Sequence, residues 1–267
     1  MMSTSIKLAT WNLCLGLQNK KDYVSHKLNQ ENIDICCLQE CEIPNDLEDK
    51  HLTLRDYKIE LEDNQRKKRT GILIHNRINY ERKRNLEDIN TNLVIIDING
   101  DIEYRVVNVY RSFAPERNAT PTDNFINQLR LINNAITDSP NRTHIIMGDF
   151  NLDFNKIYIN SYPFSHLFNH LLATFDPLGL QQLVNFETWH RFVNGEKRFS
   201  IIDHIYSDHP EQISNLMSTL TDIGDHMLIS CEIVASKSPK KVIMKRDWRN
   251  YSKDKLIMKL KKLSTYR

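Results

Sequence analysis

The sequence predicts an α/β or α+β layered sandwich, and three features favour this fold class. Apolar runs of strand length recur from residue 6 to residue 234, segments with helical spacing lie between some of them, and turn signals separate others. With 267 residues the chain can hold one large domain or two small ones. Since no internal repeat or domain break is visible before Ser236, residues 1–236 are expected to form one domain.

Two early strands are predicted to end on oxygen-bearing side chains. Residues 6–12 alternate enough to form the first, which ends at Asn12, and a helix-compatible stretch follows over 20–32. The second strand, over 33–38, runs into Glu40. Oxygens at two strand ends would suit a hard cation such as Mg²⁺, although an exposed strand-end acid is the simpler explanation of Glu40 alone.

The next part of the chain contains strands joined by a tight turn. Strands are predicted over 71–75 and 92–98, and Asn99-Gly100 is a strong hairpin signal. The return strand, over 102–109, finishes at Tyr110-Arg111. Tyr110 therefore also lies at a predicted strand end.

Two helices are predicted in the second half of the chain. The first covers residues 123–138, and the apolar residues that repeat at helical spacing are Phe125, Leu129, Ile132 and Ile136. That stripe is typical of a face packed on a core rather than of a cofactor site. The second, over 165–175, is expected to be broken by the sequence Asp176-Pro177-Leu178-Gly179.

The stretch from His144 to Asn151 is the centre of the predicted fold. Three apolar residues run into Gly148, and Asp149 and Asn151 follow, two positions apart. Residues i and i+2 of an extended backbone point to the same side, so both side chains can face one small volume. Such a strand end is where α/β enzymes tend to keep their chemistry, and the alternative is a turn after a core strand.

A basic hairpin is predicted next. Residues 188–189 and 199–206 flank a segment with Asn194-Gly195 at its tip, and this segment carries three permanent positive charges: Arg191, Lys197 and Arg198. A solvated hairpin is the alternative to a binding element. The last predicted strand, over 227–234, follows the sequence Gly224-Asp225-His226.

Composition argues against a membrane or secreted protein. No apolar run approaches the ~18–20 residues that span a bilayer, and the N-terminus lacks the layout of a secretory signal. Five cysteines, at positions 14, 36, 37, 41 and 231, form an odd set without a Cys-x-x-Cys pair. We therefore expect reduced, mostly buried thiols in an intracellular protein that does not bind a membrane.

Charge is distributed unevenly along the chain. Residues 237–267 contain 12 Lys or Arg and two Asp, a net charge of +10, and residues 1–236 then carry a net charge of −8. The basic segment would suit nucleic acid or an anionic surface, and a solvated linker is the alternative.

Six short motifs at predicted strand ends occur in a characteristic order. They are Trp11-Asn12, Leu38-Gln39-Glu40, Val109-Tyr110, Gly148-Asp149-Phe150-Asn151, Ser200-Ile201-Ile202-Asp203-His204 and Gly224-Asp225-His226. The set resembles the endonuclease/exonuclease/phosphatase superfamily over residues 6 to about 234. This resemblance implies a DNase-I-like, four-layer α/β sandwich of two facing mixed β-sheets flanked by helices.

Within that superfamily the chain looks most like the apurinic-like endonuclease domain of LINE-type (non-LTR) retrotransposons. The shared features are Val109-Tyr110-Arg111, Thr188-Trp189, the basic hairpin and the tail, in which Arg246-Asp247-Trp248-Arg249-Asn250-Tyr251 precedes a Lys-rich stretch. Residues 237–267 would then be a basic linker to a missing downstream reverse transcriptase domain.

The resemblance implies an activity and its partners. The chain would be a Mg²⁺-dependent DNA endonuclease, with Mn²⁺ as an alternative cation, that nicks one strand of double-stranded DNA. The 3′-hydroxyl would serve target-primed reverse transcription by the downstream domain. The isolated domain would be a monomer that acts in the nucleus. A phosphatase or phosphodiesterase of the same fold, an apurinic DNA-repair endonuclease and an inactive scaffold are the alternatives.

The resemblance also implies roles for individual residues. The catalytic set is Glu40, Tyr110, Asp149, Asn151, Asp203 and His226, and the metal set is Asn12, Glu40 and Asp225. Asp203 would orient His226, and either Asp149 or His226 would be the general base; we favour Asp149, with His226 on the phosphate. Tyr110 would lie on the phosphate or leaving-group side.

The DNA-binding set is Arg111, Thr188, Arg191, Lys197, Arg198 and Ser200. The hydroxyls of Thr188 and Ser200 would bond to phosphates, and the hairpin cations would lie along a groove. Two departures from the family pattern stand out. Gly224 replaces the usual Ser, and Ser112-Phe113-Ala114-Pro115 replaces prolines after Arg111, which leaves the role of Arg111 open.

Overall fold

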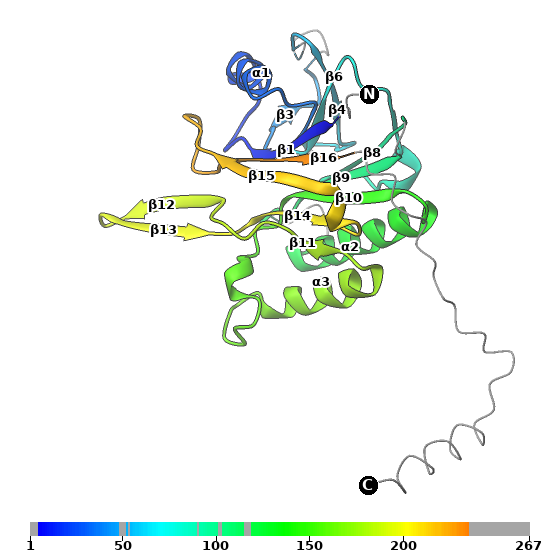
Figure 1. The fold of residues 1–267 in the computed structure, drawn as a ribbon. Coiled ribbons are helices and arrows are strands. Elements are labelled where there is room, and N and C mark those ends of the chain that lie inside the picture. The colour runs from blue at the N-terminus through cyan, green and yellow to red at the C-terminus, as the bar shows by residue number, and fades with distance from the viewer. Residues whose placement is uncertain are drawn as a thin grey trace, which may run out of the picture. The chain divides into compact units, whose positions relative to one another are not determined.

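Two six-stranded mixed β-sheets face each other in the computed structural model of the chain (Figure 1). The first sheet has the strand order β15 (Ile213–Thr219), β16 (Leu228–Ile233), β1 (Ile6–Asn12), β2 (Ile35–Gln39), β6 (Gly71–His75) and β4 (Tyr57–Leu61). The second has the order β11 (Gln181–Gln182), β14 (Asp203–Ser207), β10 (Thr143–Asp149), β9 (Tyr104–Tyr110), β8 (Leu93–Ile98) and β7 (Tyr80–Arg82).

Two strand pairs and three α-helices are the other main elements of the part of the chain that the structure describes. The pairs are β12 (Trp189–Val193) with β13 (Glu196–Ser200) and β3 (Ile43–Pro44) with β5 (Lys67–Lys68). The helices are α1 (Lys21–Gln30), α2 (Pro121–Asp138) and α3 (Ser165–Leu178), with 3₁₀ turns η2 (Arg84–Leu86), η3 (Phe154–Lys156) and η4 (Pro210–Gln212). Among the described residues, no helix has both the length and the apolar character needed to cross a membrane.

The structure describes residues 5–47, 52, 54–89, 91–100, 103–114 and 119–234. The chain divides into one unit over Met1–Ala235 and another over Ser236–Arg267. The predicted basic tail belongs to the second unit, so that prediction lies outside the described residues.

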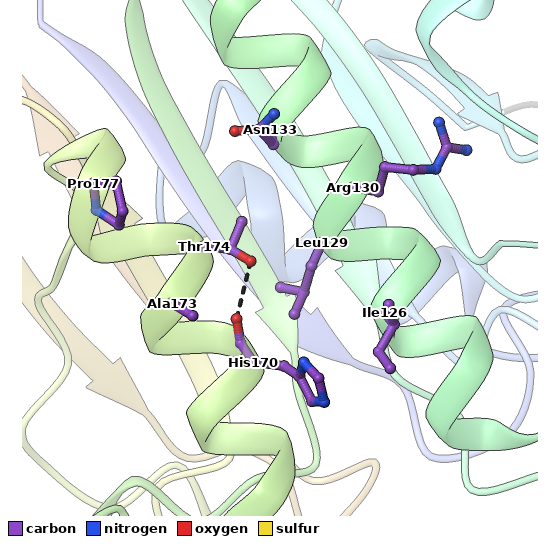
Figure 2. Close-up of a pocket in the computed structure, with 8 residues that line it drawn as sticks. All are labelled: Ile126, Leu129, Arg130, Asn133, His170, Ala173, Thr174 and Pro177. Carbon is purple, nitrogen blue, oxygen red and sulfur yellow. Dashed lines mark hydrogen bonds between the residues drawn. The ribbon is translucent and has the colours of Figure 1, made fainter.

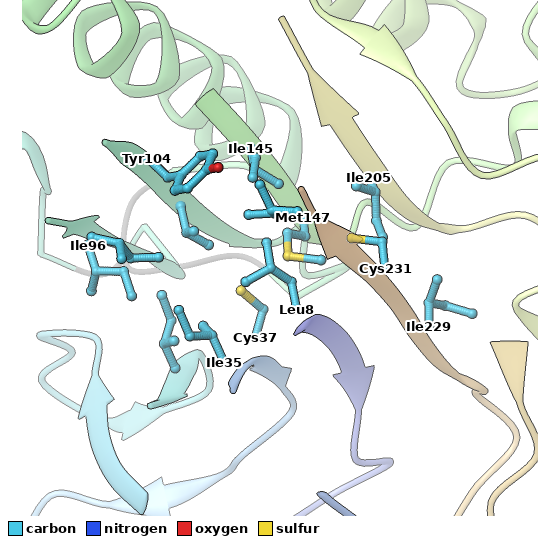
Figure 3. Packing of buried hydrophobic residues seen from close by; sticks show 14 of the residues in the cluster. Leu8, Ile35, Cys37, Ile96, Tyr104, Ile145, Met147, Ile205, Ile229 and Cys231 are labelled. Carbon is cyan, nitrogen blue, oxygen red and sulfur yellow. The ribbon is translucent and has the colours of Figure 1, made fainter. Parts of the chain in front are cut away.

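Alternation along the strands builds the four layers. In β10, Ile145 and Met147 point into a core between the two sheets (Figure 3). Ile146 points the other way and packs with residues of α2 and α3. In β1, Leu8 joins the inter-sheet core, and Ala9 and Trp11 pack with residues of α1. The layers are therefore α1, the first sheet, the second sheet, and α2 with α3, which confirms the predicted sandwich.

Each sheet has one parallel strand pair near its middle. β1 pairs with β2 and places Asn12 beside Gln39, and β9 pairs with β10 and places Tyr110 beside Asp149. Parallel strands end at the same edge of a sheet, so both sheets present the ends of their parallel pairs together. This topology explains why the predicted site residues occur at strand ends far apart in the sequence.

The predicted end of the second helix was wrong. α3 continues through Pro177 to Leu178 and ends where Gly179 adopts a left-handed φ of 73°. There the amide of Leu180 donates to the carbonyl of Phe175 at 3.1 Å, which is a glycine-terminated helix end. Proline in the last turn removes only one backbone donor, and this loss does not stop the helix before the glycine does.

Some edge strands of the structure were not predicted from the sequence, and other strands have bounds that differ from the predicted ones. β4 and β15 lie at opposite edges of the first sheet and alternate between buried or half-buried and exposed positions. Their mixed polarity gave no continuous apolar run to detect. The hairpin of β12 and β13 is confirmed, and Asn194 (φ 52°) and Gly195 (φ 81°) form its left-handed turn.

Candidate active site

Asn12 joins the two sheets at the centre of the site. Its Nδ2 donates to Glu40 Oε1 at 3.2 Å and to Asp149 Oδ2 at 2.9 Å. Asn12 is buried at the end of β1, and its Oδ1 accepts from the amide of Cys14 at 2.9 Å. One carboxamide therefore holds a carboxylate from each sheet.

Glu40 is placed by backbone geometry and by neutral donors. It follows β2 with a left-handed φ of 54°. The amide of Leu15 donates to its Oε2 at 3.1 Å, and the hydroxyl of Tyr110 donates to its Oε1 at 3.2 Å. Burial and the charge of Glu40 raise the pKa of Tyr110 far above its usual value, so the phenol remains a donor.

Asp149 is fully buried where β10 passes close to β9. A Cβ at the preceding Gly148 would lie 1.9 Å from the carbonyl oxygen of Val109, so only glycine fits there. Asp149 accepts from the amide of Asn151 at 2.8 Å and from Asn151 Nδ2 at 3.2 Å. Burial, and then the charge of Asp203, raise the pKa of Asp149 to about 7.

His226 forms an ion pair with a buried carboxylate. Its Nδ1 lies 3.0 Å from Asp203 Oδ2 and 3.2 Å from Oδ1. Burial alone would lower the pKa of His226, but the charge and hydrogen bonding of Asp203 outweigh it and raise the pKa to about 9. Asp203 is the cross-strand partner of Asp149, so the pair lies beside Asp149. Near neutral pH the ring is a cation.

Thr188 is a support rather than a surface contact. The side chain is fully buried, and its Oγ1 accepts from the amides of Ile202 and Asp203, both at 3.0 Å. Contrary to the prediction, Thr188 does not offer its hydroxyl to DNA at the surface. It fixes the start of β14 and thus Asp203.

Arg111 is likewise buried, with 3% of its surface exposed. Its guanidinium lies 4.9–5.8 Å from the ring centres of Phe113, Phe125 and Phe164. It donates to the carbonyl of Asn151 at 3.1 Å, and Asn151 Nδ2 donates back to the carbonyl of Arg111 at 2.9 Å. The predicted DNA contact is therefore corrected, since Arg111 holds Asn151 in place.

The hairpin carries the other predicted DNA-binding residues (Figure 1). Arg191 and Arg198 are exposed and directly opposite each other across the strands. Lys197 is also exposed, and its Nζ pairs with Glu187 at 2.7 Å. Ser200 is half-buried opposite Trp189 at the base of the hairpin.

The carboxylate of Glu40 and its surroundings suit the binding of a hard divalent cation. Three neutral donors among the described residues bond to this carboxylate: Asn12 Nδ2, the amide of Leu15 and the hydroxyl of Tyr110. Asp225 is bonded to the thiol of Cys14 at 3.0 Å and groups with His226 rather than with Glu40. Of the predicted metal set, the structure thus brings Asn12 and Glu40 together and places Asp225 with other partners.

Two clusters of potential ligands are less suitable for such a cation. In each cluster the potential ligand atoms lie within 4.8 Å of one another. One cluster consists of Cys14, Asp225 and His226, and the other of Asp149, Asp203 and His226. However, burial first, and then the bond to Asp225, raise the pKa of the Cys14 thiol to about 12, and His226 is protonated. Hard cations prefer carboxylate and carbonyl oxygens.

A buried pair of side-chain amides, Gln39 and Asn108, lies beneath the site and was not predicted from the sequence. Gln39 Nε2 donates to Asn108 Oδ1 at 2.7 Å, and Asn108 Nδ2 donates to the carbonyls of Leu38 and Gly71 at 2.9 and 2.7 Å. This pair bonds β2 to β9 across the core. The signal was Asn108 itself, a polar residue within an apolar strand.

A cavity of about 380 Å³ lies elsewhere, between α2 and α3 (Figure 2). It is lined by Ile126, Leu129, Arg130, Asn133, His170, Ala173, Thr174 and Pro177. None of these is a predicted site residue, and the Oγ1 of Thr174 bonds to the carbonyl of His170 at 2.9 Å. The chemistry of the site is therefore separate from this cavity.

Comparisons with known proteins agree with the fold described above. The model of the Endonuclease/Exonuclease/phosphatase family matches residues 9–226. No curated protein matches the sequence.

Solved structures share the fold at low identity. The endonuclease domain of TRAS1, a telomere-specific non-LTR retrotransposon, is 17% identical with a TM-score of 0.65, over 85% of this chain and 98% of that domain. The AP endonuclease LMAP from Leishmania major is 14% identical with a TM-score of 0.66, over 87% of this chain and 88% of that one. An AP endonuclease from Archaeoglobus fulgidus is 15% identical with a TM-score of 0.61, over 85% and 99%.

Proposed function

The chain belongs to the endonuclease/exonuclease/phosphatase family, and we propose that it is a Mg²⁺-dependent endonuclease that nicks one strand of duplex DNA. The observation that carries the proposal is the meeting of Glu40, Asp149 and the Asp203–His226 ion pair around Asn12. Metal-assisted hydrolysis of a phosphodiester uses a general base, a protein cation that contacts the phosphate and a carboxylate that holds the divalent cation.

Asp149 is proposed as the general base. A pKa of about 7 leaves it partly ionised near neutral pH and basic enough to take a proton from water. Its bonds to Asn12 and Asn151 fix the orientation of the carboxylate. The water oxygen would attack phosphorus as Asp149 takes its proton. The P–O3′ bond would break, and the departing 3′-oxygen would take a proton from solvent, which leaves a 3′-hydroxyl and a 5′-phosphate.

His226 is proposed to stabilise the phosphate rather than to accept a proton. With a pKa of about 9 its ring is already protonated at neutral pH. Asp203 occupies Nδ1, which leaves Nε2 to donate to a phosphate oxygen, where charge develops in the transition state. Tyr110 is a second neutral donor on the Glu40 side.

Glu40 would hold the divalent cation, with Asn12 beside it. When bound, that cation supplies charge neutralisation for the phosphate. The residues of the chain orient the carboxylate for this purpose, because Asn12, Leu15 and Tyr110 each donate to it.

The hairpin of β12 and β13 is proposed as the main DNA contact. Arg191 and Arg198 lie opposite each other on one face, and such like-charged pairs become favourable when an anion lies between them. Phe192 and Phe199 are 66% and 58% exposed and belong to the other face. Exposed rings can stack on bases or wedge between base steps, so the hairpin would sense groove width and deformability.

Replacing Arg191 or Arg198 by Ala is expected to weaken DNA binding several-fold and to lower the salt dependence of binding by about one ion. The kcat of nicking should stay unchanged because both residues are remote from the catalytic bonds. Binding isotherms between low and moderate salt measure this. Lys58→Ala, on the edge strand β4, is the matched control; an equal loss there would contradict a role specific to the hairpin.

The biological setting is proposed from the likeness to the TRAS1 domain and from the basic residues 237–267. The 3′-hydroxyl would prime target-primed reverse transcription by a downstream reverse transcriptase domain, and the nuclease domain would act as a monomer in the nucleus. An extension assay tests the first step, because a DNA polymerase extends nicked plasmid only from a 3′-hydroxyl.

Supercoiled plasmid incubated with Mg²⁺ tests the activity itself. We expect relaxed circles, none with a chelator, and about 100-fold slower nicking by Glu40→Gln. Glu42→Gln is the matched control, since that carboxylate pairs with Lys67 and Arg69 instead. Hydrolysis of inositol phosphates without plasmid nicking would favour a phosphatase, and strong preference for an abasic duplex would favour a repair endonuclease.

A further inference from the structure

Gly224 is a glycine because another side chain occupies its place. A Cβ at Gly224 would lie 2.3 Å from the sulfur and 2.9 Å from the Cβ of Cys14. The φ of Gly224 is outside the left-handed region, so its backbone would accept a side chain. The restriction is therefore one of space, and Cys14 imposes it.

Cys14 also bonds to the residue that follows Gly224. Its thiol donates to Asp225 Oδ1 at 3.0 Å. Asp225 directly precedes His226, and its backbone carbonyl accepts from the amide of His190 at 3.1 Å. The position of Cys14 therefore bears on the segment that presents the catalytic imidazolium.

The loop that carries Cys14 is bonded to both sides of the site. Cys14, Leu15 and Gly16 have φ values of 47°, 70° and 103°, a left-handed run that turns the loop back on itself. This turn delivers the amide of Leu15 to Glu40. On the other side, Lys20 Nζ donates to the carbonyls of Leu13 and Cys14 and, at 3.1 Å, to that of Ile223.

We propose that Cys14 is a positioning residue of the active site: its side chain fills the space beside Gly224 and its thiol holds Asp225. The loop between β1 and α1 thereby sets the spacing between Glu40 and His226. This inference rests on the proposed nuclease activity, and it assigns to Cys14 no contact with substrate or cation.

A reciprocal exchange tests the proposal. Gly224→Ser places a side chain against the sulfur, so we expect about 100-fold lower kcat for nicking and a lower unfolding temperature. Cys14→Gly loses the thiol, and we expect about 10-fold lower kcat; its φ of 47° suits glycine. In the double variant Cys14→Gly/Gly224→Ser the clash is absent and a hydroxyl stands next to Asp225.

The double variant is expected to nick at least about 10-fold faster than Gly224→Ser, with KM for plasmid unchanged throughout. Losses that simply multiply would overturn the proposal. Recovery of the unfolding temperature without recovery of kcat would also overturn it, because that is the result of a packing role alone.

A control cycle uses Cys37→Ala, which removes a buried thiol from the core between the sheets. Combined with Gly224→Ser, its effects should multiply, since the two sites are independent. If the wild-type chain does not nick plasmid at all, the proposed function fails. The unfolding temperatures of the same variants then still decide whether Cys14 and Gly224 are coupled.

Discussion

Asp149→Asn is expected to lower the kcat of plasmid nicking by about 10³-fold. The substitution keeps the size of the side chain but removes the proton acceptor. It also places an amide nitrogen where Asp149 Oδ2 now accepts from Asn12 and Asn151. Single-turnover nicking at saturating DNA measures the chemical step directly, and a rate within about tenfold of wild type would contradict the assignment of Asp149 as base.

Stability provides an independent reading of the same variant. The folded pKa of Asp149, about 7, lies above its ordinary value of 3.8, so the folded state binds the proton more tightly. This contribution to stability is present at low pH and is lost as pH rises to about 7. Asp149→Asn should lack that loss. Asp153→Asn, at a buried carboxylate that accepts from the amides of Asn155 and Ile201, is the control that should keep its nicking rate.

His226→Gln is expected to lower the nicking rate by about 10²- to 10³-fold. Glutamine can still donate a hydrogen bond but carries no charge, so the developing charge on phosphate loses its cationic partner. The change also leaves Asp203 buried without its cation, which should lower the free energy of unfolding by roughly 3 kcal/mol. Chemical denaturation measures the second effect, and His209→Gln, at a histidine that pairs with the exposed Glu211, is the control.

The pH dependence of His226 has a defined sign. Its folded pKa of about 9 exceeds its ordinary 6.5, so the contribution to stability is complete below about 6.5 and is lost as pH rises to about 9. We expect this loss in the wild-type chain and not in His226→Gln. Nicking by the wild type should rise through about pH 7 with Asp149 and fall near pH 9 with His226. The absence of the upper limb would contradict a protonated histidine.

The sequence was informative where local pattern determines structure. Apolar runs located the strands that end at Asn12 and Asp149 and the strand that Glu40 follows, and the ordered motifs indicated the layered fold. The family match and the solved structures bear out that fold. Asn12 and Glu40 could be grouped from the sequence because both lie at the ends of predicted strands, and strand ends of one sheet can meet at the same edge.

Tertiary packing determined what the sequence could not. Arg111 and Thr188 look like surface donors in sequence, but neighbouring layers cover them, and each bonds to backbone instead. The partner of Asp225 could not be predicted either, because Cys14 lies 211 positions away in the sequence. Helix α3 shows the opposite case, in which Gly179 at the helix end decided the boundary and Pro177 did not.

The amide bridges between the sheets have a mechanical consequence. Gln39 bonds to Asn108, and Asn12 bonds to Asp149. These residues belong to strands of the two sheets, so strands rather than loops fix the distance between the two sides of the site. We expect a site held in this way to be rigid. Under the proposed nicking activity, the DNA rather than the protein would deform, and we expect flexible base steps to be nicked ahead of stiff A-tracts.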